Sequence, residues 1–341
     1  YEPGVEWPLV FNLHGLGSNG AQQGFYTAFT AVADTANFIL CHPNGTDPFG
    51  LGQGWDVNFP IPPVEVDDLG CIDRFIDTIH ANYNINLGRV YSTGMSNGGY
   101  MSYKLACELT DRIQAIASVT GSIVPAELDN CTPSRTIPVM QFHGTNDGVV
   151  AYDGSNVAAP IEDVIAYWID HNECANTPDT TVIEESPTND QSSAIRISYT
   201  DCDTDREVIF YKITDGGHTW PGAALPIPNN GATNQDVNAT IEIWRFFSKY
   251  GEDIETSNNN ITKEESITVF PNPVQDLLTV QSDVSTLLDI QVYNNLGQLI
   301  LQEKNINDKT HLVSTSNLQN GIYYIHAQTE AGTFSRPFVK Q

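Results

Sequence analysis

The sequence of 341 residues is short of basic side chains and of long apolar runs. Only 15 lysine and arginine residues stand against 42 aspartate and glutamate residues, so the formal net charge is −27. A surface this negative repels nucleic acids and anionic lipids, and we expect neither as a partner. No run approaches the roughly 18 apolar residues of a membrane span, so no transmembrane segment is expected.

Leader and metal-binding patterns are also lacking. No signal-peptide pattern begins at Tyr1, which indicates a chain that is either intracellular or already processed. The six cysteines form no C-x-x-C pair, and the histidines close to a cysteine, His42 and His171, belong to no recognisable set of four ligands. We therefore expect no metal and no other cofactor.

The cysteines are even in number and spread along the chain, which argues for disulfides formed in an oxidising compartment. Six cysteines allow 15 connectivities, but pairing between sequence neighbours that flank adjacent elements is the simplest arrangement. It joins Cys41 to Cys71, Cys107 to Cys131 and Cys174 to Cys202. Each such bridge would contribute about 3 kcal/mol, and six buried free thiols are the alternative.

Apolar strand-like runs alternate with helix-like segments through the first 250 residues. Strands are predicted at 9–13, 38–41, 89–93, 115–119, 139–142 and 207–213. Helices are predicted at 22–35, 66–82, 99–108, 161–172 and 235–250. Strands interleaved with helices indicate an α/β fold whose mostly parallel sheet is covered by helices.

A polar stretch then separates this region from one of different character. Residues 252–265, with Asn258, Asn259 and Asn260 at their centre, are typical of a linker. Beyond them, short strand-like runs without internal proline or an intervening helix pattern predict a small all-β sandwich. These runs lie at 266–270, 277–280, 288–293, 299–301 and 321–326. The predicted domains are 1–251 and 266–341, joined by the linker 252–265.

The pentapeptide Gly94-Met95-Ser96-Asn97-Gly98 carries the strongest functional signal. It follows a predicted strand and precedes a predicted helix, which is the context of a nucleophile elbow. Side chains flanking the serine would collide with strand and helix, so glycine is needed on both sides. A lone G-x-S-x-G can also be an ordinary Ser-Gly turn, so the prediction needs an acid and a base further along the chain.

An acid and a histidine come after Ser96 in the order that this hydrolase architecture requires. The strand at 139–142 runs into a polar turn that ends at Asp147, and a glycine-rich loop presents His218. We predict Asp147 as the acid, with Asp153 as its rival, and His218 as the base.

Two other histidines compete with this assignment. His14 heads a glycine loop and is expected to hold that loop by hydrogen bonds, whereas His143 is expected to be packed at a strand end. In the predicted reaction, the imidazole removes the proton of the serine and the acid fixes the imidazole tautomer. Backbone N–H groups of Asn97 and of Leu16 (or Gly15) are expected to hold the oxyanion.

Residues 6–250 resemble the secreted α/β-hydrolase esterases grouped with polyhydroxybutyrate depolymerases and feruloyl or acetylxylan esterases. The matching motifs are His14-Gly15, Gly94-Met-Ser-Asn-Gly-Gly99 with Leu105-Ala-Cys-Glu108, His143-Gly-Thr-Asn-Asp147 and, most specific, His218-Thr-Trp-Pro-Gly222. The resemblance implies Ser96, Asp147 and His218 as a catalytic triad. It also implies bridges at Cys107–Cys131 and Cys174–Cys202.

Residues 265–341 resemble the C-terminal sorting domain of type IX secretion. The motifs that carry this resemblance are Val269-Phe-Pro-Asn-Pro273, Tyr293-Asn-Asn-Leu-Gly297 and Gly321-Ile-Tyr-Tyr324. It implies export to the surface or the medium of a Gram-negative bacterium, with the secretion machinery as a partner. Such a domain is normally a transport address and not a substrate binder.

The substrate is the least constrained part of the prediction. The stretches after Val119 and Gly222 look too short for a lid, and an uncovered site suits polymers. Trp220 and Trp55 are candidate walls for an acyl or aromatic group, with ordinary packing as the alternative. We predict a secreted serine carboxylesterase that acts on feruloyl or acetyl esters of plant polysaccharides through an acyl-enzyme. A polyester depolymerase is the first alternative, and a serine peptidase or a non-enzymatic binding protein is less favoured.

Overall fold

The computed structural model describes residues 4–47, 50–60, 66–251, 267–282, 285–294, 299–329 and 332–340. The chain divides into two compact units, one within residues 1–254 and the other within residues 255–341. The linker predicted at 252–265 lies outside the described residues.

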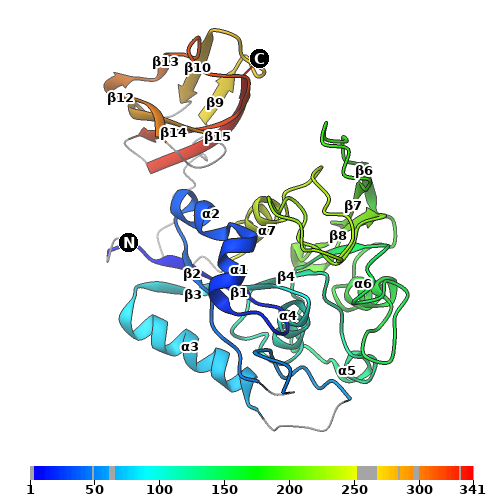
Figure 1. Ribbon diagram of the computed structural model, residues 1–341. Helices are drawn as coiled ribbons and strands as arrows, with labels where there is room; N and C mark the ends of the chain where they lie inside the picture. The colour runs from blue at the N-terminus through cyan, green and yellow to red at the C-terminus, as the bar shows by residue number, and fades with distance from the viewer. Residues whose placement is uncertain are drawn as a thin grey trace. The chain divides into compact units, whose positions relative to one another are not determined.

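The N-terminal unit is built on one eight-stranded sheet. Its strands are β1 (Trp7–Leu13), β2 (Ile39–Cys41), β3 (Ile85–Met95), β4 (Ala115–Val119), β5 (Val139–Gly144), β6 (Asp179–Val182), β7 (Ser193–Tyr199) and β8 (Val208–Thr214). They lie in the order β2-β1-β3-β4-β5-β8-β7-β6. Figure 1 shows β8, β7 and β6 following one another at one end of the sheet. The pairings from β2 to β8 are parallel, and those that add β7 and β6 are antiparallel. The predicted α/β fold with a mostly parallel sheet is confirmed.

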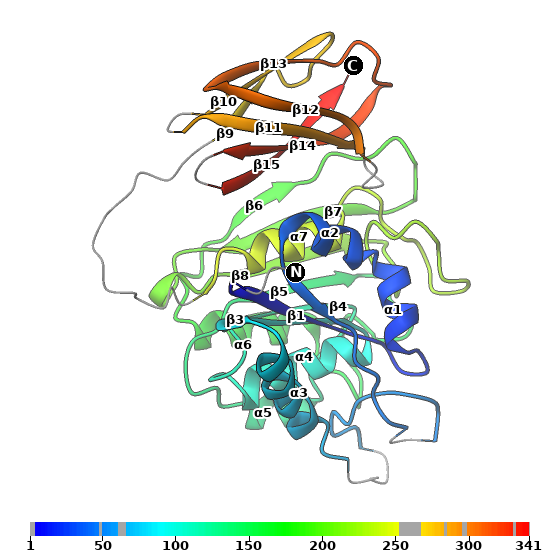
Figure 2. The ribbon, with the colours of Figure 1, turned by 90° about the vertical axis from the view of Figure 1, so that its left-hand side faces the viewer.

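Helices cover both faces of this sheet (Figure 2). They are α1 (Gly20–Thr27), α2 (Phe29–Ala36), α3 (Asp68–Asn82), α4 (Asn97–Glu108), α5 (Pro125–Asn130), α6 (Ile161–His171) and α7 (Ala239–Phe247). Side chains alternate across each strand. On β1, Leu9 and Phe11 therefore join the core under α3, α4 and α6, whereas Val10 joins the core under α2 and α7.

Several elements of this unit differ from the prediction, among them the short helix α5, which was not predicted. The helix expected at 22–35 is two helices, because Ala28 takes a left-handed backbone with φ 52°. Strands β6 and β7 were not predicted, since all residues of β6 are exposed and β7 buries few side chains. Periodicity in apolar residues cannot identify a strand that buries little.

The C-terminal unit contains two antiparallel sheets. Their strands are β9 (Ile267–Phe270), β10 (Leu277–Ser282), β11 (Leu287–Asn294), β12 (Leu299–Asp308), β13 (Thr310–Ser314), β14 (Gly321–Thr329) and β15 (Gly332–Lys340). One sheet has the order β13-β10-β9 and the other β12-β11-β14-β15. Buried side chains from both sheets, such as Val280 and Ile325, form one core. The predicted small sandwich is confirmed, although β13 and β15 were not predicted.

Two of the three disulfides derived from sequence neighbours are present, Cys107–Cys131 and Cys174–Cys202. The prediction of a third bridge is wrong, because Cys41 and Cys71 are free thiols. Cys41 ends the edge strand β2, whereas Cys71 belongs to α3, which packs on β3. Strand β1 lies between β2 and β3 in the sheet, so the strand that carries Cys41 is separated from the strand on which the helix of Cys71 packs. Burial raises the pKa of the Cys41 thiol to about 11, which disfavours its reactive thiolate.

This disulfide pattern predicts two thiols reactive in denaturant without reductant, and six after reduction. Replacing Cys174 and Cys202 together by alanine is expected to lower the free energy of unfolding by about 3 kcal/mol, because the bridge closes a long loop. Urea titration followed by tryptophan fluorescence measures this, since all five tryptophans lie in the N-terminal unit. Cys71→Ser, which removes no bridge, is the control. The absence of reactive thiols before reduction would contradict the pairing.

Candidate active site

The backbone at Ser96 is held in a strained turn between β3 and α4. Ser96 has φ 54° and ψ −122°, a conformation that L residues rarely adopt. A Cβ on Gly94 would lie 2.5 Å from the carbonyl of Gly98, and one on Gly98 would lie 2.2 Å from Leu13 O. Side chains at either glycine would therefore break the turn. This agrees with the strand–turn–helix context expected for a nucleophile elbow.

The loop after β1 lies directly against Ser96. A Cβ placed on Gly15 would be 3.9 Å from Ser96 Oγ. His14 is buried, and its Nε2 accepts a hydrogen bond of 2.9 Å from Gly45 N while its Nδ1 lies 2.9 Å from Gly15 O. The ring therefore holds the loop, as expected, and is not available as a base.

The Asn97 side chain ties the start of α4 to a neighbouring loop. Its Oδ1 accepts from Trp55 N at 2.6 Å, and its Nδ2 donates to Trp55 O at 3.0 Å. The Trp55 indole in turn donates to His14 O at 2.9 Å. These bonds use both polar atoms of the Asn97 side-chain amide, so the first residue of α4 is fixed to the loop that carries Trp55.

The prediction that Trp55 and Trp220 form substrate walls is wrong. Each side chain is only 1% exposed. Trp55 is held by the bonds to Asn97 and His14, and the Trp220 indole donates to Thr240 Oγ1 at 2.9 Å. Both indoles therefore reach polar partners inside the core, which favours burial of the whole side chain.

Asp147 and His218 form a buried pair. Asp147 Oδ2 lies 2.8 Å from His218 Nδ1, and its Oδ1 accepts from the backbone N–H groups of Val149 and Val150 at 2.9 Å each. Asp147 is 6% exposed and His218 is 5% exposed. The rival acid Asp153 is exposed, so the structure favours Asp147 as the partner of the imidazole.

Glycines allow the loop that carries Asp147 and the loop that carries His218 to pack closely against neighbouring backbone. A Cβ on Gly144 would lie 2.1 Å from Gly216 O, and one on Gly217 would lie 2.0 Å from Asn230 O. His218 N donates to Asn230 O at 2.7 Å, and Asn230 Nδ2 donates back to His218 O at 3.1 Å. Asn230 thus fixes the His218 loop. The sequence offered no local signal for this role.

Ser96 and His218 line the same pocket, which has a volume of about 730 Å³. Apolar side chains from α1, from the end of β3 and from two loops surround it, namely Phe25, Tyr26, Met95, Leu16 and Ile227. Among the described residues, no hydrogen bond joins Ser96 Oγ to the His218 ring. Such contacts are often long in unliganded enzymes and shorten when substrate binds.

The stretch after Gly222 differs from the prediction. It was expected to be short, but 16 residues separate Gly222 from α7. Ile227 and Asn230 of this stretch line the pocket. One wall of the site therefore comes from this loop, which was predicted to be too short for a lid.

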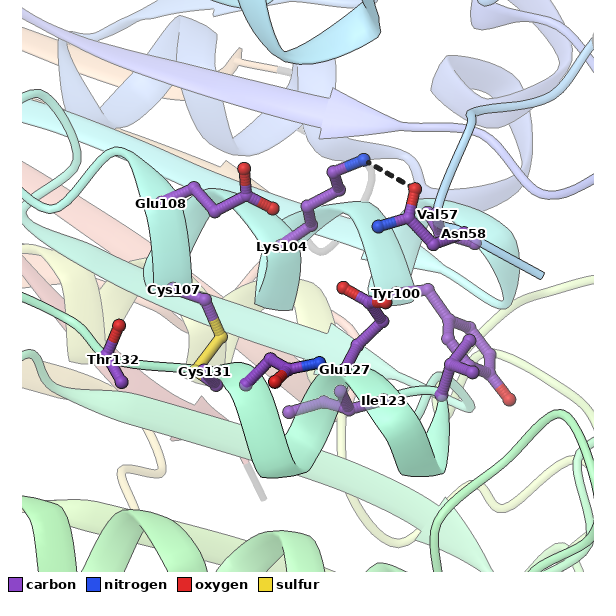
Figure 3. A pocket seen from close by; sticks show the side chains of 12 residues that line it. Val57, Asn58, Tyr100, Lys104, Cys107, Glu108, Ile123, Glu127, Cys131 and Thr132 are labelled. Carbon is purple, nitrogen blue, oxygen red and sulfur yellow. Dashed lines mark hydrogen bonds between the residues drawn. A yellow bond between two sulfur atoms is a disulfide. The ribbon is translucent and has the colours of Figure 1, made fainter. Parts of the chain in front are cut away.

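A second hollow of about 330 Å³ lies between α4 and α5 and does not include Ser96 or His218. Figure 3 shows the Cys107–Cys131 disulfide at the edge of this hollow. It also shows the hydrogen bond of 3.3 Å that Lys104 Nζ donates to Asn58 Oδ1. Its remaining lining includes the carboxylates of Glu108 and Glu127. This hollow lacks a nucleophile with a base, so it is not the candidate active site.

Within the described ranges, no group of three or more histidine, cysteine, aspartate or glutamate side chains is arranged to hold a metal ion. In the same part of the chain, no helix is both long and apolar enough to cross a bilayer.

Three histidines of the N-terminal unit are desolvated by burial, which lowers the pKa of His14, His42 and His143 below the ordinary value of 6.5. In the unfolded chain they bind protons near that value. Below it the unfolded state therefore holds more protons, and the free energy of unfolding falls as the pH falls.

We expect a lower urea midpoint at about pH 5 than at about pH 7.5, measured by tryptophan fluorescence. His143→Gln removes one of these titrating groups and should weaken the dependence on pH. A midpoint that rises on acidification would contradict this account of the buried histidines.

Comparison with known proteins gives different results for the two units. Residues 268–341 match the family described as secretion system C-terminal sorting domain. The chain is 26% identical to the bifunctional acetylxylan esterase/xylanase XynS20E of Neocallimastix patriciarum, over 72% of this chain and 31% of that protein. It is 33% identical to feruloyl esterase B of Piromyces equi, over 43% of this chain and 27% of that protein. The chain thus spans about a third or less of these two relatives.

Other relatives are covered more fully. The probable feruloyl esterase C of Aspergillus terreus is 26% identical, over 73% of this chain and 80% of that protein. Among solved structures, acetyl xylan esterase from Aspergillus awamori is similar with a TM-score of 0.47 and 13% identity, over 71% of this chain and 89% of that one. The N-terminal unit is therefore similar in sequence to proteins named as acetylxylan and feruloyl esterases. Residues 268–341 match a secretion sorting domain, which indicates type IX secretion to the cell surface or beyond it.

Proposed function

We propose that the protein is a serine esterase in which Ser96, His218 and Asp147 form the catalytic triad. The observation that carries this proposal is the buried Asp147–His218 pair, which opens into the same pocket as the strained Ser96 turn. The chain order of the three residues agrees with that of α/β-hydrolases.

The proposed reaction has two halves. Ser96 Oγ attacks the ester carbonyl carbon while His218 Nε2 takes the hydroxyl proton, and the same proton passes to the leaving alcohol. The C–O bond of the ester breaks, and an acyl-serine remains. Water then attacks the acyl group with His218 again as base, which releases the acid and restores Ser96.

Backbone N–H groups are proposed to hold the oxyanion. The first N–H groups of a helix have no acceptor within it, and Asn97 begins α4 next to Ser96. The second donor would be Leu16 N, in the loop that lies against Ser96 through Gly15. Losing one such donor typically costs about 3–4 kcal/mol of barrier.

The substrate is proposed to be a feruloyl or acetyl ester on a plant polysaccharide. The apolar lining of the pocket, which includes Leu16, Tyr26 and Ile227, suits an acyl group. The names of the relatives and secretion from the cell agree with a substrate that lies outside it. A polyester depolymerase remains the second candidate, because the same pocket would suit a polyester segment.

A panel of substrates separates these candidates. The native protein is incubated with methyl ferulate, acetylated xylan, nitrophenyl esters of increasing chain length, polyester films and the matching anilides. We expect cleavage of the ferulate or acetyl esters at a far higher kcat/KM than of the anilides. Cleavage of films alone would favour the depolymerase, and preferential anilide turnover would indicate a peptidase.

A further inference from the structure

A second histidine contacts the carboxylate that faces His218. His143 lies on β5 and is 1% exposed. Its Nε2 is 2.9 Å from Val150 O and 3.5 Å from Asp147 Oδ2, the same oxygen that faces His218. The Asp147 carboxylate is therefore flanked by two imidazole rings.

The surrounding hydrogen bonds fix the tautomer of this ring. Gln141 Oε1 accepts from the Tyr103 hydroxyl at 2.8 Å, and Gln141 Nε2 lies 2.9 Å from Gly121 O, so the amide nitrogen faces the carbonyl. That nitrogen also lies 3.0 Å from His143 Nδ1, which must then accept a hydrogen bond from it. Val150 O can only accept, so it requires the hydrogen on Nε2. Both sides of the ring thus place the hydrogen on Nε2, which bonds to Val150 O and lies 3.5 Å from Asp147 Oδ2.

The ring is kept neutral by its surroundings. Burial lowers the pKa of His143 and outweighs the charge of Asp147 and the nearby carbonyls, which favour the cation. The other titratable groups that face this pair are His218, the Tyr152 ring at 6.1 Å, and Tyr100 of α4, whose pKa is raised by burial and by the charge of Asp147. Glu162 and Lys212 contact Tyr152 on its far side.

We propose that His143 is a positioning residue for the acid of the triad, with Gln141 and Tyr103 holding its Nε2–H toward Asp147. This inference rests on the proposed function. The N–H dipole beside Oδ2 of Asp147 offsets part of the negative charge of this carboxylate. The imidazolium of His218 is then stabilised less than it would be by an isolated carboxylate.

The pH dependence of kcat/KM tests this role, because it reports the base of the free enzyme. In His143→Leu the Nε2–H donor is absent. The acid limb of the pH profile of kcat/KM should then move to higher pH by roughly half a unit. In His143→Gln an amide N–H can occupy the place of Nε2–H, and the limb should return toward the native position. A purely structural role would lower kcat/KM in both variants without moving the limb.

Two results would overturn the proposal: an acid limb in His143→Leu that coincides with the native one, or an equal displacement in His143→Gln. Tryptophan fluorescence checks the fold of each variant. If His143→Leu does not fold, the same pH profile is measured for Tyr103→Phe. This variant removes the hydrogen bond that orients the Gln141 amide, and so loosens the hold of Gln141 on the His143 ring. A smaller displacement in the same direction supports the proposal, and an unchanged limb overturns it. Retained turnover in Ser96→Ala would instead refute the proposed triad, so the two failures are distinguishable.

Discussion

Replacing Ser96 by alanine is expected to lower kcat for ester hydrolysis by roughly 10⁶-fold, because no other group supplies the attacking oxygen. The fold should persist, since alanine fits the space of serine and the turn is held by Gly94 and Gly98. Initial rates with methyl ferulate and a nitrophenyl ester measure the loss. Binding of substrate in the pocket should change far less than turnover.

Ser18→Ala is the matched control for this experiment. Ser18 lines the same pocket, and its hydroxyl donates to Gln22 Oε1 at 3.1 Å. Because it has no role in the proposed chemistry, its removal should leave kcat within a few-fold of the native value. Hydrolysis that survives in Ser96→Ala but is lost in Ser18→Ala would place the nucleophile elsewhere in the pocket.

Replacing Asp147 by asparagine is expected to lower kcat by roughly 10⁴-fold. An asparagine can turn its NH₂ group toward His218 Nδ1 and so stabilise the tautomer that cannot accept the serine proton. It also removes the charge that favours the imidazolium formed in the transition state. The loss should therefore appear in kcat more than in KM.

Asp153→Asn is the matched control here, because Asp153 is the rival acid six residues further along the chain. Its side chain is exposed, so its substitution should leave kcat nearly unchanged. Equal losses in the two variants would remove Asp147 from its assigned role. A loss confined to Asp153→Asn would transfer that role to Asp153.

The fold could be predicted wherever burial leaves a periodic pattern. Strand β4 has all five residues buried, and its predicted bounds are those observed. Strand β6 has all four residues exposed, so no pattern revealed it. The left-handed turn at Ala28, which divides the expected helix 22–35, had no glycine or proline to mark it.

The candidate site shows the same limit. Ser96 and His218 could be proposed because glycines lie beside them in the sequence, and glycine is needed where two backbones come close together. The structure has such close backbone contacts at Gly98 and Gly217. The residues that line the pocket could not be predicted, because residues such as Tyr26 and Ile227 are far apart in the sequence and are brought to the same pocket only by the tertiary fold. Trp220 was assigned to the site because it lies two residues after His218, and Trp55 was assigned from the glycine-rich stretch Gly52-Gln-Gly-Trp-Asp56. Sequence distance does not determine the direction of a side chain, and both are buried.

The most direct test of the central claim is the mass of the covalent adduct formed with an alkyl phosphonate that mimics the ester. We expect one phosphonyl group per chain, and peptide mapping should place it on Ser96. The adduct should be absent from Ser96→Ala, and Asp147→Asn should slow its formation. A stable adduct on any other residue, or equal labelling of Ser96→Ala, would contradict the account.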